Sequence, residues 1–137
     1  MKITPLSAVG AEVTEVDVTV LTAVQDAQLK AAFAQHGLLI FRDQDLTEAD
    51  HIGLAERWGQ INTNRFFKAH ADYPQIALVD KTPDQIQNIG GDWHTDHSYD
   101  QVPALGSILV AQVLPETGGD TWFASMYRAF DQLSDGL

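Results

Sequence analysis

The residues best suited to chemistry stand together in the run Trp93-His94-Thr95-Asp96-His97. In an extended segment the side chains at positions i and i+2 point to the same face, so the His94 imidazole and the Asp96 carboxylate can converge on one ion. Two His and one carboxylate form the facial triad that holds Fe(II) and leaves positions open for a co-substrate and O₂. The pair would supply two of these three ligands. When the motif is considered alone, a hydrogen-bonded surface pair is the alternative.

Carboxylates offer a second arrangement in the same part of the chain. Asp92, Asp96 and Asp100 recur at a spacing of four, and on a helix this spacing would gather them into a site for Mg²⁺ or Ca²⁺. The glycines Gly90-Gly91 before them and Pro103 after them argue against a helix there. We therefore favour the extended His-x-Asp arrangement.

Composition narrows the classes of chemistry further. The 137 residues include no Cys, which excludes disulfides, thiolate nucleophiles and iron–sulfur clusters. With 8 Lys+Arg against 19 Asp+Glu, the net charge is −11. Nucleic acids and membranes are not expected as partners, because binding them begins with Lys and Arg that neutralise phosphate. Residues 1–13 contain no continuous apolar run, so we expect no signal peptide or spanning helix and a cytoplasmic location.

The elements that must position this chemistry are expected within one domain over residues 1–137. Hydrophobic residues make up 45% of the chain, enough for a packed core, and no repeat or linker divides it. Thr22 with Gln25, and Thr47 with Asp50, have the spacing that begins a helix. In chain order we expect one or two strands in residues 9–20, a helix from Thr22 to Gly37, a strand at 38–41, a helix from Thr47 to Gly59, strands at 75–80, 106–114 and 121–123, and a last helix from about Ser125.

Two stretches, residues 61–73 and 82–92, follow neither the helical nor the strand period. We predict long loops there, and long loops in compact domains tend to carry function. The second of them leads directly into the His-x-Asp pair. These loops are therefore the expected walls of the site.

Several motifs around the pair have a recognisable order. They are Leu39-Ile40-Phe41-Arg42-Asp43-Gln44, Trp58-Gly59, Trp93-His94-Thr95-Asp96, Pro103-Ala104-x-Gly106-Ser107-Ile108-Leu109 and Leu114-Pro115-x-x-Gly118-Gly119-Asp120-Thr121. In order and spacing they resemble the taurine dioxygenase/TfdA family of Fe(II)- and 2-oxoglutarate-dependent dioxygenases. The resemblance extends over nearly the whole chain.

This resemblance implies an α+β fold: a double-stranded β-helix, or jelly roll, with flanking helices, incomplete at the carboxy terminus. It implies that His94 and Asp96 are iron ligands, and that the Thr121 hydroxyl binds a carboxylate of 2-oxoglutarate. An ordinary strand threonine is the alternative interpretation of Thr121. The implied reaction consumes 2-oxoglutarate and O₂, hydroxylates a small organic anion, and releases succinate and CO₂. Nothing in the sequence decides whether the protein is a homo-oligomer.

Substrate choice is where the sequence departs from relatives that bind taurine. The His and Tyr that such members carry in the loop after the second helix correspond here to Asn64 and Phe67, and a substrate-binding Asn corresponds to Gly90. We therefore expect an alkyl sulfate, a sulfonate or a phenoxyalkanoate rather than taurine. His97 is assigned to substrate binding or to structure rather than to the metal. Arg65, Lys68 and His70 are candidate partners for the anion, and a solvated loop cation is the alternative for each.

Two residues that the implied reaction requires do not occur after His97. No further His follows, and the only cation after Lys81 is Arg128, on the predicted last helix. We therefore interpret the chain as the amino-terminal part of one TauD/TfdA-like dioxygenase domain. The alternative, from a different functional class, is a catalytically inactive fragment or binding module.

Overall fold

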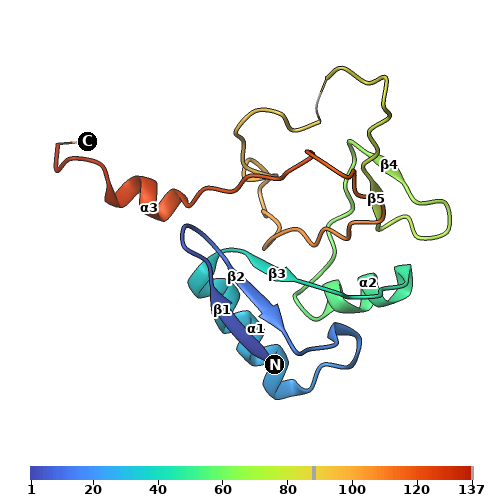
Figure 1. Cartoon of the computed structure of the whole chain (residues 1–137), viewed down its shortest axis with the longest axis horizontal. Coiled ribbons are helices and arrows are strands. Elements are labelled where there is room, and N and C mark those ends of the chain that lie inside the picture. The colour runs from blue at the N-terminus through green and yellow to red at the C-terminus, as the bar shows by residue number, and fades with distance from the viewer. Residues whose placement is uncertain (88, 137) are drawn as a thin grey trace. The chain divides into compact units, whose positions relative to one another are not determined.

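The computed structural model describes residues 1–87 and 89–136. These residues fall into two compact units, one formed by Met1–Asp45 with the segment from Ala111 onward, and the other by Leu46–Val110. Figure 1 labels the helices and strands of both units. Each unit is described by itself below.

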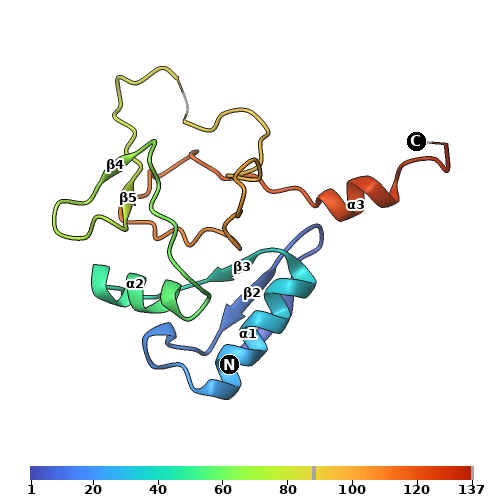
Figure 2. The same ribbon diagram turned by 180° about the vertical axis from the view of Figure 1, so that it is seen from behind.

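A three-stranded sheet with the order β1-β2-β3 organises the amino-terminal unit. β1 (Lys2–Pro5) pairs antiparallel with β2 (Ala11–Thr14), and β2 pairs parallel with β3 (Leu39–Phe41). Parallel strands require a crossover connection, which α1 (Ala23–His36) provides. Figures 1 and 2 show this helix along one face of the sheet. The strand predicted at residues 38–41 is therefore confirmed as β3.

The core of this unit lies between the sheet and α1. Ala11 and Val13 of β2 and Leu29 of α1 are all 0% exposed. The short helix η1 (Val18–Val20) leads from β2 towards α1. Gln44 fixes its start, because the Gln44 Oε1 accepts the N–H of Val18 at 3.0 Å. Burial of these apolar side chains is the main stabilising term available to the unit.

The predicted limits of α1 are confirmed. The Thr22 hydroxyl accepts the N–H of Gln25 at 3.3 Å, and the Gln25 Oε1 accepts the N–H of Thr22 at 3.0 Å. This reciprocal pair satisfies two backbone donors that the first helical turn leaves without partners. At the other end Gly37 has φ 73, a left-handed conformation that glycine adopts without a steric penalty.

The second helix, α2 (Glu48–Glu56), begins as predicted and ends earlier than predicted. Thr47 and Asp50 form its capping box, and the Asp50 Oδ2 accepts the N–H of Thr47 at 3.1 Å. Arg57 is the C-cap, so the prediction that the helix continues to Gly59 was wrong. The Arg57 N–H bonds to a carbonyl three residues back, and this tightening of the last turn ends the helix.

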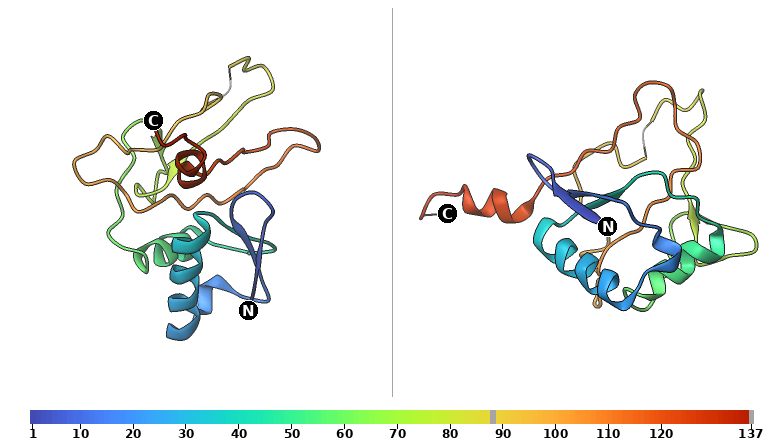
Figure 3. Two further views of the ribbon diagram at one scale, coloured as in Figure 1. Left: turned by 90° about the vertical axis from the view of Figure 1, so that its left-hand side faces the viewer. Right: turned by 60° about the horizontal axis from the view of Figure 1, so that its bottom comes forward.

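Beyond α2 the regular elements are short. β4 (Lys68–Ala69) and β5 (Ala77–Leu78) pair antiparallel, which confirms a strand within the predicted range 75–80. α3 (Met126–Asp131) begins after its N-cap Ser125, as expected. Figure 3 shows the long irregular trace, coloured yellow to orange, that runs between β5 and α3.

The described residues do not form a jelly roll. They contain only the three-stranded and the two-stranded sheet. Strands predicted at residues 106–114 and 121–123 are absent in this structure. An extended backbone becomes a strand only when a neighbouring strand accepts and donates its hydrogen bonds, and no described segment pairs with either range.

Candidate metal and substrate site

His94 and Asp96 face each other, as their spacing predicts. The His94 Nε2 lies 3.3 Å from the Asp96 Oδ1. On the other side of the ring, Nδ1 lies 2.7 Å from the carbonyl oxygen of Asp92. A carbonyl oxygen only accepts, so Nδ1 carries a proton and donates it. The remaining ring nitrogen therefore points at the carboxylate.

This arrangement fits a divalent metal ion. A neutral His94 would direct the Nε2 lone pair at a carboxylate oxygen, and two acceptors this close require a proton or a cation between them. Metal–ligand bonds of about 2.1 Å at a right angle separate neighbouring ligand atoms by about 3 Å. The observed 3.3 Å is close to that value. The Asp92 carbonyl then acts as the outer partner that orients a ligating His.

The ligand set within the described residues has two members. No group of three or more His, Asp or Glu side chains suited to a metal occurs in residues 1–87 and 89–136. The alternative carboxylate cluster is not formed, because residues 92–100 contain no helix and Asp100 pairs with other side chains. His94 and Asp96 have side chains that are 54% and 63% exposed. The pair is thus open to solvent.

Two contacts connect α2 with the surroundings of Asp96. The His51 Nε2 on α2 donates to the carbonyl oxygen of Ile108 at 3.1 Å. The neighbouring Ser107 hydroxyl donates to the Asp96 Oδ2 at 3.5 Å, the outer limit of a hydrogen bond. The helix therefore helps to place the irregular segment that supports the second carboxylate oxygen.

Gly90 lies against the ring of His94. A Cβ atom at Gly90 would stand 3.0 Å from the His94 Cε1, tighter than nine in ten real Cβ contacts. Its φ of +65 also lies in the left-handed region that favours glycine. Gly90, which corresponds to a substrate-binding Asn in taurine-binding relatives, therefore leaves space for the His94 imidazole.

Asn64 and His97, both predicted to bind substrate, contact each other. The Asn64 Nδ2 and the His97 Nε2 are 3.3 Å apart. The His97 Nδ1 lies 3.2 Å from the Asp100 Oδ2, and the Nη2 of Arg65 donates to the Asp100 Oδ1 at 3.2 Å. In the sequence, Asp100 was a candidate only for the alternative carboxylate cluster, and its contact with His97 was not predicted. Its position three residues after a His, in a segment that turns, is the signal that could have revealed it.

Aromatic rings surround His97. The Phe66 and Tyr99 rings lie 5.7 Å and 5.8 Å from the His97 ring, measured between centroids. The Arg65 guanidinium stands 5.3 Å from the centroid of Phe66. Phe66 and Tyr99 are 62% and 67% exposed, so their faces are available to a ligand, and Phe67 is half-buried. Arg65 was a candidate for the substrate anion, yet its charge is paired with Asp100.

Thr121, the predicted partner of 2-oxoglutarate, belongs to the other compact unit. It is exposed and follows Gly118 and Gly119, whose φ values of 77 and 73 make a left-handed bend. Its role towards 2-oxoglutarate stays a prediction.

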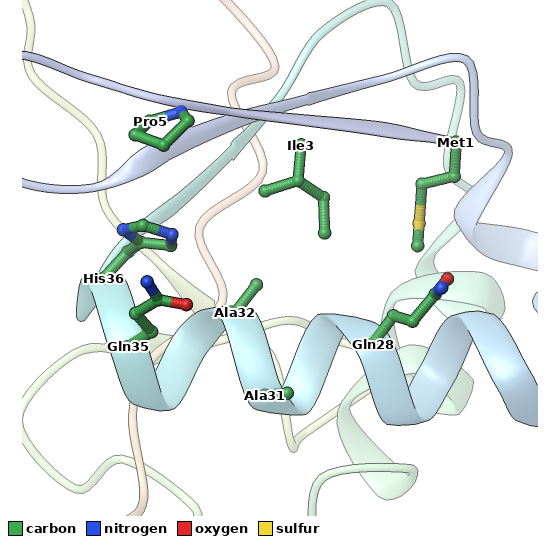
Figure 4. Close-up of a pocket in the computed structure, with 8 residues that line it drawn as sticks. All are labelled: Met1, Ile3, Pro5, Gln28, Ala31, Ala32, Gln35 and His36. Atoms are coloured by element: carbon green, nitrogen blue, oxygen red, sulfur yellow. The ribbon is translucent and has the colours of Figure 1, made fainter.

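A hollow of about 490 Å³ lies in the amino-terminal unit, between β1 and α1. Figure 4 shows side chains of β1 above the helix and Gln28, Gln35 and His36 rising from α1. None of the predicted site residues lines it.

Within the described part of the chain, no helix has the length and apolar character needed to cross a membrane.

Comparison with known protein families shows which family the chain resembles. A sequence model described as the taurine catabolism dioxygenase TauD, TfdA family matches residues 2–137. The chain belongs to the TauD/TfdA family. The members of this family are 2-oxoglutarate-dependent oxidoreductases.

Individual relatives agree with this assignment. The chain is 34% identical to an (S)-phenoxypropionate/alpha-ketoglutarate-dioxygenase of Sphingobium herbicidovorans, over 98% of the chain and 48% of that protein. It is 36% identical to a protein of the same name from Delftia acidovorans, over 98% of the chain and 50% of the relative. The chain thus spans about half the length of these TauD/TfdA relatives.

A solved structure supports the fold. It comes from Burkholderia xenovorans and is named as a candidate alpha-ketoglutarate-dependent taurine dioxygenase. The two chains are 31% identical with a TM-score of 0.54, and the match covers 61% of this chain and 31% of the other. Part of the chain therefore follows the path of a TauD-like fold.

Proposed function

We propose that this chain carries the His-x-Asp part of the iron site, and the substrate loop, of a dioxygenase that consumes 2-oxoglutarate. The reaction would hydroxylate a small organic anion and give succinate and CO₂ as co-products. The observation that carries the proposal is the His94 Nε2 facing the Asp96 Oδ1 at 3.3 Å, while the ring's other nitrogen is held by a backbone carbonyl.

The roles of the residues follow from their chemistry. His94 and Asp96 would hold Fe(II), which together with 2-oxoglutarate and O₂ supplies the oxidising power of the reaction. Thr121 would donate a hydrogen bond from its hydroxyl to a carboxylate of 2-oxoglutarate. A complete site also needs a second His for the metal and an Arg for the far carboxylate, which bidentate pairing suits.

For the substrate we propose a phenoxyalkanoate, a sulfonate or an alkyl sulfate in preference to taurine. The relatives named above act on phenoxypropionate by name, and a yeast relative is named a sulfonate dioxygenase. The exposed rings of Phe66 and Tyr99 offer flat apolar contact to an aromatic acid. The Asn64 amide is occupied by backbone and His97 contacts, which leaves it little capacity for an amine such as that of taurine.

A second candidate function is a binding module without catalysis. It is favoured by one observation: the two ligand side chains are more than half exposed, and the described residues add no third ligand. A two-ligand site open to water should hold Fe(II) weakly. The two candidates therefore differ in the affinity for metal and in turnover.

The deciding experiment measures anaerobic Fe(II) binding and succinate formation. Both are measured for this chain and for a form extended at its carboxy terminus to include a second His and an Arg. We expect only the extended form to turn over, with phenoxyalkanoates, sulfonates and alkyl sulfates tested beside taurine. Asp96→Asn should abolish turnover, whereas Asp72→Asn, a matched change in an exposed loop, should not. Succinate formation stimulated by taurine alone would contradict the proposed substrate class. Unchanged turnover in Asp96→Asn would contradict the proposed metal site.

A further inference from the structure

Four side chains connect the loop after α2 with the segment that carries the iron ligands. We call them the latch; they are Asn64, Arg65, His97 and Asp100. We propose that Asp100 is a positioning residue: it accepts hydrogen bonds from the His97 Nδ1 and from Arg65, and the latch thereby fixes the substrate loop against the segment of the proposed metal ligands. The link to substrate rests on the proposed function; the hydrogen bonds of the His97 ring do not.

The orientation of Asn64 is the first step. Its Oδ1 accepts the backbone N–H groups of Phe66 at 2.8 Å and Phe67 at 3.2 Å. Two donors converge on this atom, so the network assigns it as the oxygen and the other end of the amide as the nitrogen. An amide nitrogen only donates. The His97 Nε2, 3.3 Å away, must therefore accept and carry no proton.

The other ring nitrogen of His97 faces an acceptor. Nδ1 donates to the Asp100 Oδ2 at 3.2 Å, because a carboxylate oxygen accepts. The second carboxylate oxygen of Asp100 accepts from Arg65 at 3.2 Å. The side chains of His97 and Asp100 are only 22% and 21% exposed, so water competes little for these bonds. In each of these contacts a donor thus faces an acceptor.

The latch connects two segments distant in sequence. Its two links join residues 33 and 35 positions apart, and both run from adjacent residues of the loop to one turn. That turn is closed by the N–H of Asp100 bonding to the carbonyl of His97 at 3.1 Å. Asp96 immediately precedes the turn. The latch therefore sets the distance between the exposed loop rings and the metal ligands, while its own charges are paired and its His cannot bind the metal through Nε2.

The direct test is the protonation of the His97 ring, read by ¹⁵N–¹H NMR of this chain, with His97→Gln used to assign the signal. We expect the proton on Nδ1. In Asn64→Asp the new carboxylate still accepts the two backbone N–H groups but cannot donate to Nε2, so this hydrogen bond should be lost and the ¹⁵N signal of Nε2 should shift. Asn62→Asp, the same change two residues earlier in the loop, should leave the ring unchanged. A proton on Nε2 in the unmodified chain, or no change in Asn64→Asp, would overturn the proposal.

A second test asks whether Asp100 positions the substrate loop, and it uses the form extended at the carboxy terminus. Asp100→Ala should raise KM for the organic acid about tenfold, with kcat and the Fe(II) affinity changed less than about twofold, because the substrate loop alone is released. Asp100→Asn should recover part of this loss, since its oxygen can still accept from His97. Equal loss of kcat and Fe(II) affinity in Asp100→Ala would overturn the role. If no acid is turned over, the proposed function fails while the NMR result still decides the latch.

Discussion

Residues 1–45 hold six of the seven buried apolar side chains found in the described part of the chain, whereas residues 61–110 hold none. The first region is a layer of sheet and helix with apolar contacts between them. The second contains only the two short strands β4 and β5, and hydrogen bonds between side chains position its parts. Buried apolar contacts tolerate changes at the surface. A polar network depends on each donor and acceptor, and this region holds the residues proposed for the metal and the substrate.

The largest effect is expected from the packed layer. Leu29→Ala removes a side chain that is 0% exposed and should lower the free energy of unfolding by about 2–5 kcal/mol. Urea denaturation followed by circular dichroism measures it. Val24→Ala on the same helix, where Val24 is 69% exposed, should change this free energy by less than about 0.5 kcal/mol. Equal effects of the two variants would mean that the layer has no core.

Alanine substitutions at two glycines of the second unit should separate an effect on Fe(II) binding from an effect on helix stability. Gly90→Ala places a Cβ 3.0 Å from the His94 Cε1 and should weaken Fe(II) binding about tenfold, because it displaces a metal-binding ring. Gly53→Ala, in α2 with no atom within 4 Å of the new Cβ, should stabilise the helix by about 0.5–1 kcal/mol. Anaerobic Fe(II) titration reads the first effect and thermal unfolding the second. A loss of Fe(II) affinity in Gly53→Ala would contradict the assignment.

Threonine hydroxyls allow a similar comparison of the two regions. Thr22→Ala removes the N-cap of α1 and should cost about 1 kcal/mol of stability, most of which Thr22→Ser should restore. Thr95 makes a hydroxyl contact of 2.6 Å with Ser98 in an exposed turn. Thr95→Ala should cost less than about 0.5 kcal/mol. Denaturant midpoints measure the three variants, and a larger cost at Thr95 would place a cooperative unit around the metal pair.

The smallest effect concerns two exposed carboxyl groups, one in each region. The Thr19 hydroxyl, with the Thr19 backbone N–H, lowers the pKa of Asp17 below its ordinary value. The Thr82 hydroxyl does the same to the pKa of Asp84. A lowered folded-state pKa contributes stability that is present above the ordinary pKa and is lost as the pH falls through the folded value. NMR titration should show both midpoints below the ordinary value, and Thr19→Val and Thr82→Val should each raise only the neighbouring one.

Local signals could predict the first region well. The capping box at Thr22 and the glycine at Gly37 lie within a few residues of the groups they satisfy, so their spacing is enough to define α1. The same holds for His94 and Asp96, whose convergence needs only an extended backbone between them. The TauD/TfdA resemblance, based on contiguous motifs, was confirmed for the same reason.

Contacts between distant segments could not be predicted in this way. The link between Arg65 and Asp100 joins residues 35 positions apart through loops without any period, so nothing in the local pattern indicates it. The pattern of residues 106–114 correctly shows apolar character, yet a strand also needs a partner, and the described residues supply none. The prediction for α2 placed its end at Gly59. The helix ends at Glu56 instead, because its last turn tightens before that glycine is reached.

The connection of β2 to β3 through α1 has a consequence for how the chain folds. Every element of this layer lies within the first 41 residues, and its strands pair across one crossover. Contacts between residues near in sequence close short loops and form quickly. A ribosome adds about 5–20 residues per second, so this layer can assemble before the segment with the proposed metal ligands has been synthesised. Its folding need not wait for a metal ion.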